Sequence, residues 1–292
     1  MHPFKCPETG PFPAIVTEIC TQYLPQESVQ SLTYQPQGLS NDNYCLVTDK
    51  HTYLLKFYRQ VLPVAQLKAQ QTFSQLDLCP RVIAVDTDKN AALFDYLDGE
   101  KSTHFELNKL VNLLSTLHKH KDSAQPLVVC DNFKYYQHLP EYAFFNELIS
   151  ELKSSLSQFP IQVGYCHNDL ELSNFLRHQS QCHDKWFLLD FEYAHNNDVF
   201  FDLAAMSVSF SLTDTQKNEF LRAYITANNI NFDFLQAQKK LVTYQLIYLL
   251  LCYFWYVSRQ LDSQAKLTWT QITQLKTTQL NLKTLNPTNS LS

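Results

Sequence analysis

Two short stretches decide how this chain is interpreted: Tyr165-Cys-His-Asn-Asp-Leu-Glu-Leu-Ser-Asn174 and Trp186-Phe-Leu-Leu-Asp-Phe-Glu-Tyr193. In each of them, polar side chains follow directly after an apolar run that predicts a β-strand. The polar positions that form the candidate site are His167, Asp169, Asn174 and Asp190. A single aspartate after a strand is usually a turn former. Four such residues in this order indicate a site.

Carboxylate and amide oxygens in this order suit phosphoryl transfer. That reaction needs a carboxylate to orient the attacking hydroxyl and accept its proton, and oxygen ligands to hold Mg²⁺ on the nucleotide phosphates. We expect Asp169 to act on the hydroxyl, and Asn174 and Asp190 to hold the metal. His167 is the second candidate in the catalytic motif. We expect it to brace the loop rather than to act as a base.

The spacing His167-x-Asp169-x₄-Asn174, followed by Asp190-Phe-Glu-Tyr193, resembles the choline kinase and aminoglycoside phosphotransferase superfamily, which shares the protein-kinase-like fold. The resemblance runs from about Gln37 to Arg259 and is strongest to choline/ethanolamine kinases, then to bacterial thiamine kinases. It implies ATP and Mg²⁺ as cofactors and a small-molecule hydroxyl acceptor. It also implies that Asp202 braces the catalytic loop.

The resemblance extends to a nucleotide site in the first hundred residues. It implies that a short turn within Gln37–Tyr44 faces the phosphates, that a strand lysine binds them, and that a hinge meets adenine. The residues concerned are Gly38, Ser40, Asn41 and Asn43 in the turn, Lys56 on the strand, and Asp95, Tyr96 and Leu97 in the hinge.

One departure concerns the partner of Lys56. Kinases of this fold usually pair the strand lysine with a helix glutamate, and no Glu occurs between Gln60 and Leu76. We therefore expect Gln70 or Gln71 to take that place as a neutral partner.

The acceptor is expected to be a cationic alcohol. A quaternary ammonium cannot donate hydrogen bonds and is held by aromatic faces and carboxylates. Trp255 and Tyr256 are the candidates for an aromatic cage. Glu192 is a candidate ligand for the cation or for a second metal, with a structural role as the alternative. Choline or ethanolamine is the first candidate acceptor, and thiamine is the second. An aminoglycoside comes third, because that pocket usually needs many carboxylates.

The pattern of elements predicts an α+β, protein-kinase-like fold of two lobes. A β-rich nucleotide-binding lobe is expected over residues 1–98 and a helical catalytic and acceptor-binding lobe over 99–292. Strands are predicted at Leu32–Gln35, Tyr44–Thr48, Thr52–Tyr58, Arg81–Asp86, Ala91–Tyr96 and Val163–Cys166, and helices at Pro13–Leu24, Val61–Leu76, His104–His118 and Pro140–Gln158. Thr213–Gln216 has the spacing of a capping box.

Composition excludes several other classes. The net charge of −5 without a dense basic cluster argues against nucleic-acid binding. Eight scattered cysteines and an N-terminus without an apolar run predict reduced thiols in a cytoplasmic protein. The uncharged segment Leu241–Val257 predicts a buried helix rather than stable membrane insertion. The oligomeric state stays open.

Two rival functions remain. A degenerate kinase fold that binds a ligand without turnover is the first, and the missing helix Glu is its support. A metal hydrolase using His167, His183 and Asp190 is the second, and it lacks a recognised ligand spacing.

Overall fold

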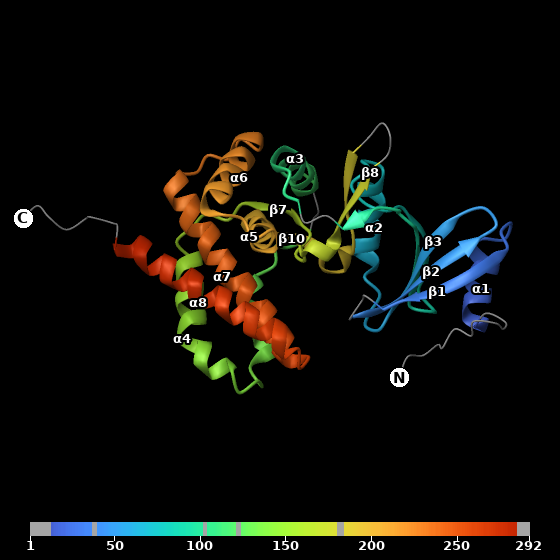
Figure 1. The fold of residues 1–292 in the computed structure, drawn as a ribbon, viewed down its shortest axis with the longest axis horizontal. Coiled ribbons are helices and arrows are strands. Elements are labelled where there is room, and N and C mark those ends of the chain that lie inside the picture. Colours follow the sequence, from blue (N-terminus) through green and yellow to red (C-terminus); the bar gives the residue numbers. More distant parts are fainter. Residues whose placement is uncertain (1–12, 37–39, 102–103, 121–123, 180–183, 285–292) are drawn as a thin grey trace, which may run out of the picture. The chain divides into compact units, whose positions relative to one another are not determined.

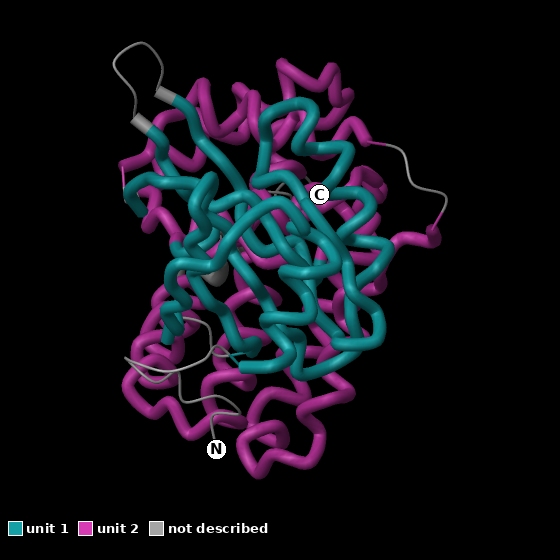
Figure 2. The backbone as a smooth tube through the Cα atoms, turned by 90° about the vertical axis from the view of Figure 1, so that its right-hand side faces the viewer, with its two compact units in different colours: residues 1–102, 173–193 teal, residues 103–172, 194–292 magenta. Residues whose placement is uncertain are grey.

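The computed structural model describes residues 13–36, 40–101, 104–120, 124–179 and 184–284. The chain divides into two compact units (Figure 2). Unit 1 comprises Met1–Ser102 and Ser173–Tyr193, and unit 2 comprises Thr103–Leu172 and Ala194–Ser292. The first boundary lies four residues after the predicted one, and the segment 173–193, predicted with the C-terminal lobe, groups with unit 1.

Unit 1 is built on a five-stranded antiparallel sheet with the order β1-β2-β3-β5-β4 (Figure 1). Its strands are β1 (Val29–Gln35), β2 (Asn41–Thr48), β3 (Thr52–Tyr58), β4 (Val82–Asp86) and β5 (Ala91–Asp95). A tight turn joins β2 to β3, in which the Thr48 amide donates to the His51 carbonyl at 2.9 Å.

Alternation along the strands gives this sheet two different faces. Tyr44, Leu46, Leu55 and Leu93 point to a core shared with α1 (Ala14–Tyr23), to which the helix contributes Val16 and Ile19. The opposite face carries a smaller cluster that includes Leu67 of α2 (Val64–Ser74). Because Lys56 alternates with Leu55 and Phe57, it belongs to this second face.

The segment 173–193 adds a hairpin to unit 1. Strands β8 (Phe175–Gln179) and β9 (Asp184–Leu188) pair with each other, and β6 (Glu100–Lys101) pairs with β8. The Leu188 amide donates to the Leu78 carbonyl at 2.8 Å, and Phe191 of the short helix η3 (Phe191–Tyr193) stacks on Phe73 of α2. These contacts explain why the segment belongs with the N-terminal sheet.

Unit 2 is mainly helical. A two-stranded ladder of β7 (Val163–Cys166) and β10 (His195–Asp198) carries the catalytic motif, and α5 (Val199–Ser209) follows it directly. The other elements are α3 (Leu107–His118), η1 (Val129–Tyr136), α4 (Tyr142–Leu156), α6 (Asp214–Ala227), α7 (Phe234–Ser258) and α8 (Asp262–Thr284). The capping box predicted at the start of α6 is confirmed by reciprocal bonds between Thr213 and Gln216.

Helix α7 is the central helix of unit 2. It packs against α4, α5, α6, α8 and η1. By length and composition it could cross a membrane, and no other helix among the described residues meets that test. Over its most apolar window, however, 56% is buried inside the protein. The buried helix predicted for Leu241–Val257 therefore lies within α7, which serves here as a core helix.

Candidate active site

In unit 1, Lys56 is the centre of a cluster of charges. Its Nζ lies 2.6 Å from Asp190 Oδ1 and 3.3 Å from Glu192 Oε2, and 4.9 Å from the centroid of the Tyr58 ring. Lys56 is only 4% exposed, so its charge depends on these carboxylates. The strand lysine and the Asp-Phe-Glu motif, 134 residues apart in sequence, therefore meet in unit 1.

The predicted Gln70 or Gln71 partner is wrong. Gln70 Nε2 donates to the Pro80 carbonyl at 3.0 Å, and Gln71 Oε1 accepts from the Val82 amide at 3.2 Å. Both glutamines thus tie α2 to the segment that leads into β4. The second carboxylate at Lys56 is Glu192, which follows Asp190 in the same motif.

Asn41 and Asn43 lie in a strand rather than in the predicted turn. They form the start of β2 because they pair with Tyr58 and Lys56 of β3. Asn43 lies directly opposite Lys56, and Asn41 Nδ2 donates a hydrogen bond to Glu192 Oε2. Ser40 precedes β2 and is half-buried, whereas the predicted Gly38 lies outside the described residues.

The predicted adenine hinge follows β5. The Asp95 amide donates to the Arg81 carbonyl at 3.0 Å, and the Tyr96 amide donates to the Thr52 carbonyl at 3.2 Å. The Asp95 carboxylate pairs with Arg81. Because both amides already serve the sheet, a contact with adenine would have to use the carbonyls of this segment or the Leu97 amide.

Asn174 and Asp190 meet at one end of the β8–β9 hairpin. The Leu189 amide donates to the Asn174 carbonyl at 2.9 Å, which places the two predicted metal ligands on adjacent backbone segments. Asn174 is buried, and Asp190 has a left-handed backbone with φ 63°. An amide and a carboxylate oxygen are ligands that Mg²⁺ accepts, so the residues present fit this metal.

Burial governs the ionisation of this cluster. Desolvation, followed by repulsion from Asp190, raises the pKa of Glu192, while Lys56 and Asn41 oppose the rise. Desolvation also raises the pKa of Tyr58, and both carboxylates add to that shift. Lys56 and Asn41 thus favour the charged form of Glu192, whereas burial and Asp190 oppose it.

In unit 2, Asp169 lies on the loop that follows β7. Asn168, the residue before it, has a left-handed backbone with φ 63°. The side chain of Asn168 accepts from Asn197 Nδ2 at 2.7 Å, and the Glu171 amide donates to the Asp169 carbonyl at 3.0 Å. Left-handed residues other than glycine are held by their surroundings, and such strain gathers at functional sites.

The predicted brace is present. Asp202, in the first turn of α5, accepts the His167 amide at 2.7 Å and the Asn168 amide at 2.9 Å. His167 itself is fully buried. Its backbone serves the brace, which agrees with a structural role for this residue.

Tyr248, Cys252 and Tyr256 follow one another at a spacing of four residues on α7 and lie within the electrostatic influence of Asp169 and Glu171. Burial raises the pKa of Tyr256 to about 12, with contributions from Cys252, Glu171 and Asp169. Burial also raises the pKa of Tyr248, and Asp169 and Glu171 again contribute. Of the two predicted cage residues, Tyr256 belongs to this row, whereas the ring of Trp255 contacts Tyr256 at its edge and lies 5.3 Å from the Arg259 guanidinium.

Sequence reasoning missed several residues of the site. His118 and Tyr224 join Asp202 through hydrogen bonds, and Asn197 holds Asn168. His118 and Tyr224 lie far from the motif in sequence, on α3 and α6, and Asn197 lies on β10. No local pattern marks them.

Taken together, the fold and the charged motifs define a small-molecule kinase. The chain belongs to the phosphotransferase enzyme family, whose model matches residues 32–238. A LicA homolog from Metamycoplasma hominis is 28% identical over 172 residues, which is 52% of this chain and 62% of that protein. The chain thus matches about three fifths of the length of this curated relative.

Solved structures show the same fold. Choline kinase LicA from Streptococcus pneumoniae is 20% identical with a TM-score of 0.73, covering 89% of this chain and 97% of that one. A Plasmodium vivax ethanolamine kinase is 14% identical with a TM-score of 0.67, covering 87% of this chain and 82% of that one. These comparisons confirm the predicted protein-kinase-like fold.

Proposed function

We propose that this kinase transfers the terminal phosphoryl group of ATP to the hydroxyl of a small cationic alcohol, choline or ethanolamine first. The observation that supports the substrate class is the row Tyr248, Cys252 and Tyr256, spaced four residues apart on α7, whose pKa values the charges of Asp169 and Glu171 help to raise. Aromatic faces beside carboxylates suit an ammonium group, each cation–π contact contributing about 0.5–2 kcal/mol.

In this proposal Asp169 orients the acceptor hydroxyl and takes its proton as the oxygen attacks phosphorus. Lys56 neutralises charge on the nucleotide phosphates, and Glu192 with Asn41 keeps Lys56 in place. Asn174 and Asp190 would hold Mg²⁺, which neutralises phosphate charge when it is bound. Ser40, Asn43 and Asp95–Leu97 remain the proposed nucleotide contacts.

The chemistry of the family leaves thiamine as the second candidate. Thiamine also joins a permanent cation to a primary hydroxyl, so the same aromatic and acidic groups would serve it. An aminoglycoside carries several ammonium groups and would need more carboxylates than Asp169 and Glu171 provide on this face.

The test is an assay of ADP release with Mg-ATP and a panel of choline, ethanolamine, thiamine and kanamycin, with the product identified by phosphorus NMR. We expect turnover with choline or ethanolamine and its loss in Asp169→Asn. Kanamycin as the preferred acceptor, or ATP hydrolysis without phosphorylation of any amino alcohol, would overturn the assignment.

A matched pair tests the aromatic contact. Tyr256→Leu should raise the KM for choline by about 2- to 30-fold because it removes the ring face, whereas Tyr256→Phe should change it little. Glu171→Gln should also raise this KM. Equal effects of the Leu and Phe variants would show that the ring does not meet the cation.

A further inference from the structure

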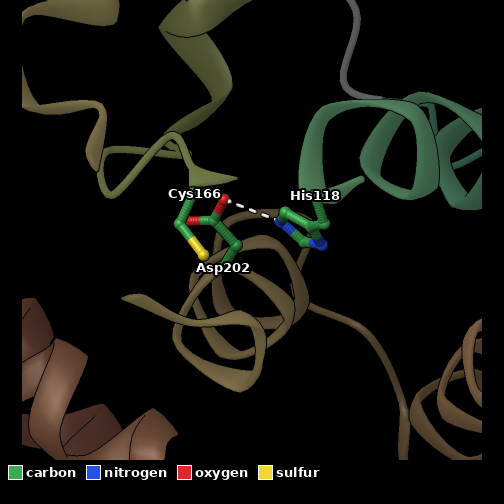
Figure 3. A group of neighbouring side chains, drawn as sticks. All are labelled: His118, Cys166 and Asp202. Carbon is green, nitrogen blue, oxygen red and sulfur yellow. Dashed lines mark hydrogen bonds and ion pairs between the residues drawn. The ribbon is translucent and has the colours of Figure 1, made fainter. Parts of the chain in front are cut away.

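Ligand atoms of His118, Cys166 and Asp202 lie within 4.8 Å of one another, which is close enough for a metal ion (Figure 3). Hydrogen bonds already occupy this cluster, because both nitrogens of His118 are engaged and Asp202 accepts two backbone amides. Burial, with Asp202 and Asp198 adding to it, raises the pKa of the Cys166 thiol, which opposes the thiolate that a metal requires. The cluster therefore belongs to the catalytic loop and is not a metal site.

In unit 1, an ion pair with a buried carboxylate lies where β3 ends and β2 begins. The Arg59 guanidinium binds the Asp42 carboxylate with two nitrogens, since Nε lies 3.1 Å from Oδ2 and Nη2 lies 2.6 Å from Oδ1. The Asp42 side chain is 4% exposed and the Arg59 side chain 44%. A carboxylate this deeply buried is unfavourable unless a cation and hydrogen bonds compensate it, and the two-pronged contact supplies both.

The ion pair bears on which face of the sheet each side chain at the start of β2 occupies. Asn43 lies directly opposite Lys56 of β3. Because side chains alternate along a strand, Asn41 and Asn43 point to the Lys56 face and Asp42 to the other. The bond from Asn41 Nδ2 to Glu192 Oε2 agrees with this alternation. A slip of one residue in the pairing would turn Asp42 to the Lys56 face, where it would compete with Glu192 for the lysine.

The backbone of Arg59 is itself fixed by Asn90, which lies in the turn before β5 and has φ 53°. Asn90 Nδ2 donates to the Gln60 carbonyl at 2.6 Å and also to the Tyr58 carbonyl. The Tyr58 amide in turn donates to the Asn90 carbonyl at 2.9 Å. The guanidinium therefore extends from a fixed backbone, so less conformational entropy is lost when it binds Asp42.

We propose that Arg59 is a positioning residue for the phosphates of the nucleotide. It holds Asp42 on the face away from Lys56, which fixes the pairing register where β2 begins and keeps Asn43 on the lysine face. The guanidinium binds on the opposite face, so it acts through the strand rather than by touching the phosphates. The inference rests on the proposed nucleotide contacts of Lys56, Ser40 and Asn43.

Calorimetry on the full chain tests the proposal, with adenosine and magnesium-bound AMP-PNP, a non-hydrolysable ATP analogue, as the two ligands. Arg59→Gln should weaken AMP-PNP binding by about 5- to 20-fold, since the Asp42 carboxylate loses its cation and the start of β2 loses its register. Adenosine has no phosphates, so its Kd should stay within about twofold of the wild-type value.

Two further variants separate positioning from direct phosphate binding. Arg59→Lys keeps a cation without the planar fork and should recover part of the lost affinity for AMP-PNP. The double variant Arg59→Gln, Asp42→Asn removes the buried charge and should recover most of that affinity, because two amides can bond across the same positions. A double variant that binds AMP-PNP as weakly as Arg59→Gln would refute the action through Asp42.

Lys185→Gln is the control. It breaks the 2.6 Å ion pair between Lys185 and Asp77 elsewhere in unit 1, and both affinities should stay unchanged. Equal losses for AMP-PNP and adenosine in Arg59→Gln, or unchanged binding of AMP-PNP, would overturn the positioning role. Failure of the wild type to bind AMP-PNP would refute the proposed nucleotide contacts, and this inference with them.

Hydrogen exchange reports on the strand without any ligand. In Arg59→Gln the amides of Asn41, Asp42 and Asn43 should exchange faster, and the double variant should restore their rates. Amides of the β4–β5 ladder should keep their wild-type rates in both. Unchanged exchange at the start of β2 would refute the role of the ion pair in the register even if the affinity for AMP-PNP fell.

Discussion

Replacing Lys240 with methionine should lower the free energy of unfolding by about 3–5 kcal/mol, because it leaves a buried carboxylate without its cation. Lys240 Nζ lies 2.6 Å from Asp198 Oδ2 and 2.6 Å from the Pro160 carbonyl oxygen. The two side chains are 1% and 4% exposed. Methionine has a similar volume, so the loss arises from charge rather than from a cavity.

Asp198 links this loss of stability to the helix that carries Asp202. Its carboxylate accepts the Phe200 amide at 3.1 Å and thereby caps α5, the helix that carries Asp202. Asparagine caps helices about as well as aspartate. The free energy of unfolding of the double variant Lys240→Met, Asp198→Asn should therefore lie within about 1–2 kcal/mol of the wild-type value, since no buried charge remains.

The pH dependence has a definite sign. Burial raises the pKa of Asp198, and Lys240 opposes that rise. Without the lysine the pKa of Asp198 rises further, so the folded protein binds the proton more strongly than the unfolded chain. Stability of Lys240→Met should then fall as pH increases from the ordinary aspartate range, about 4, through the raised value. The loss in free energy of unfolding of Lys240→Met relative to the wild type should be larger at about pH 7.5 than at about pH 5.

Urea unfolding followed by circular dichroism at both pH values measures these differences. Lys239→Met is the matched control, because this neighbouring lysine is half-buried and should cost less than about 0.5 kcal/mol. If Lys240→Met were as stable as Lys239→Met, or if the double variant were less stable than the single one, the reasoning from the buried pair would be refuted.

Three further predictions concern other parts of the molecule. Lys56→Met should weaken Mg-ATP binding by about tenfold or more in calorimetry, since it removes the buried cation that faces Asp190 and Glu192; unchanged affinity would contradict its phosphate role. Gly164→Ala should lower the free energy of unfolding by about 1–3 kcal/mol in urea, because its Cβ meets Val199 at 2.6 Å. Thr213→Ala should destabilise α6 by about 1 kcal/mol, whereas Thr213→Ser should keep the cap.

The sequence predicted the fold and the chemical motifs well because both depend on local pattern. Strand β3 was predicted with its observed bounds, since apolar and polar residues alternate along it and a turn precedes it. Asn174 directly precedes strand β8, and Asp190 follows strand β9. Because these two strands form a hairpin, both residues lie at its open end.

What the sequence could not provide depends on contacts between distant segments. Asn41 and Asn43 look like turn residues, and only pairing with β3 makes them a strand. Family resemblance predicts the partner of Lys56 on α2, but Glu192 of a distant segment fills that place. His118 ends an ordinary amphipathic helix, and its partners lie 84 and 106 residues away.

The discontinuous make-up of unit 1 has a consequence for synthesis of the chain. The sheet strands β1–β5 leave the ribosome early, but the carboxylates that neutralise Lys56 follow it by 134 residues or more. At roughly 5–20 residues per second, the lysine waits about 7–27 s for Asp190. Its burial before then would be unfavourable. Unit 1 should therefore reach its final packing only after residues 103–172 of unit 2 have been translated, although it begins the chain.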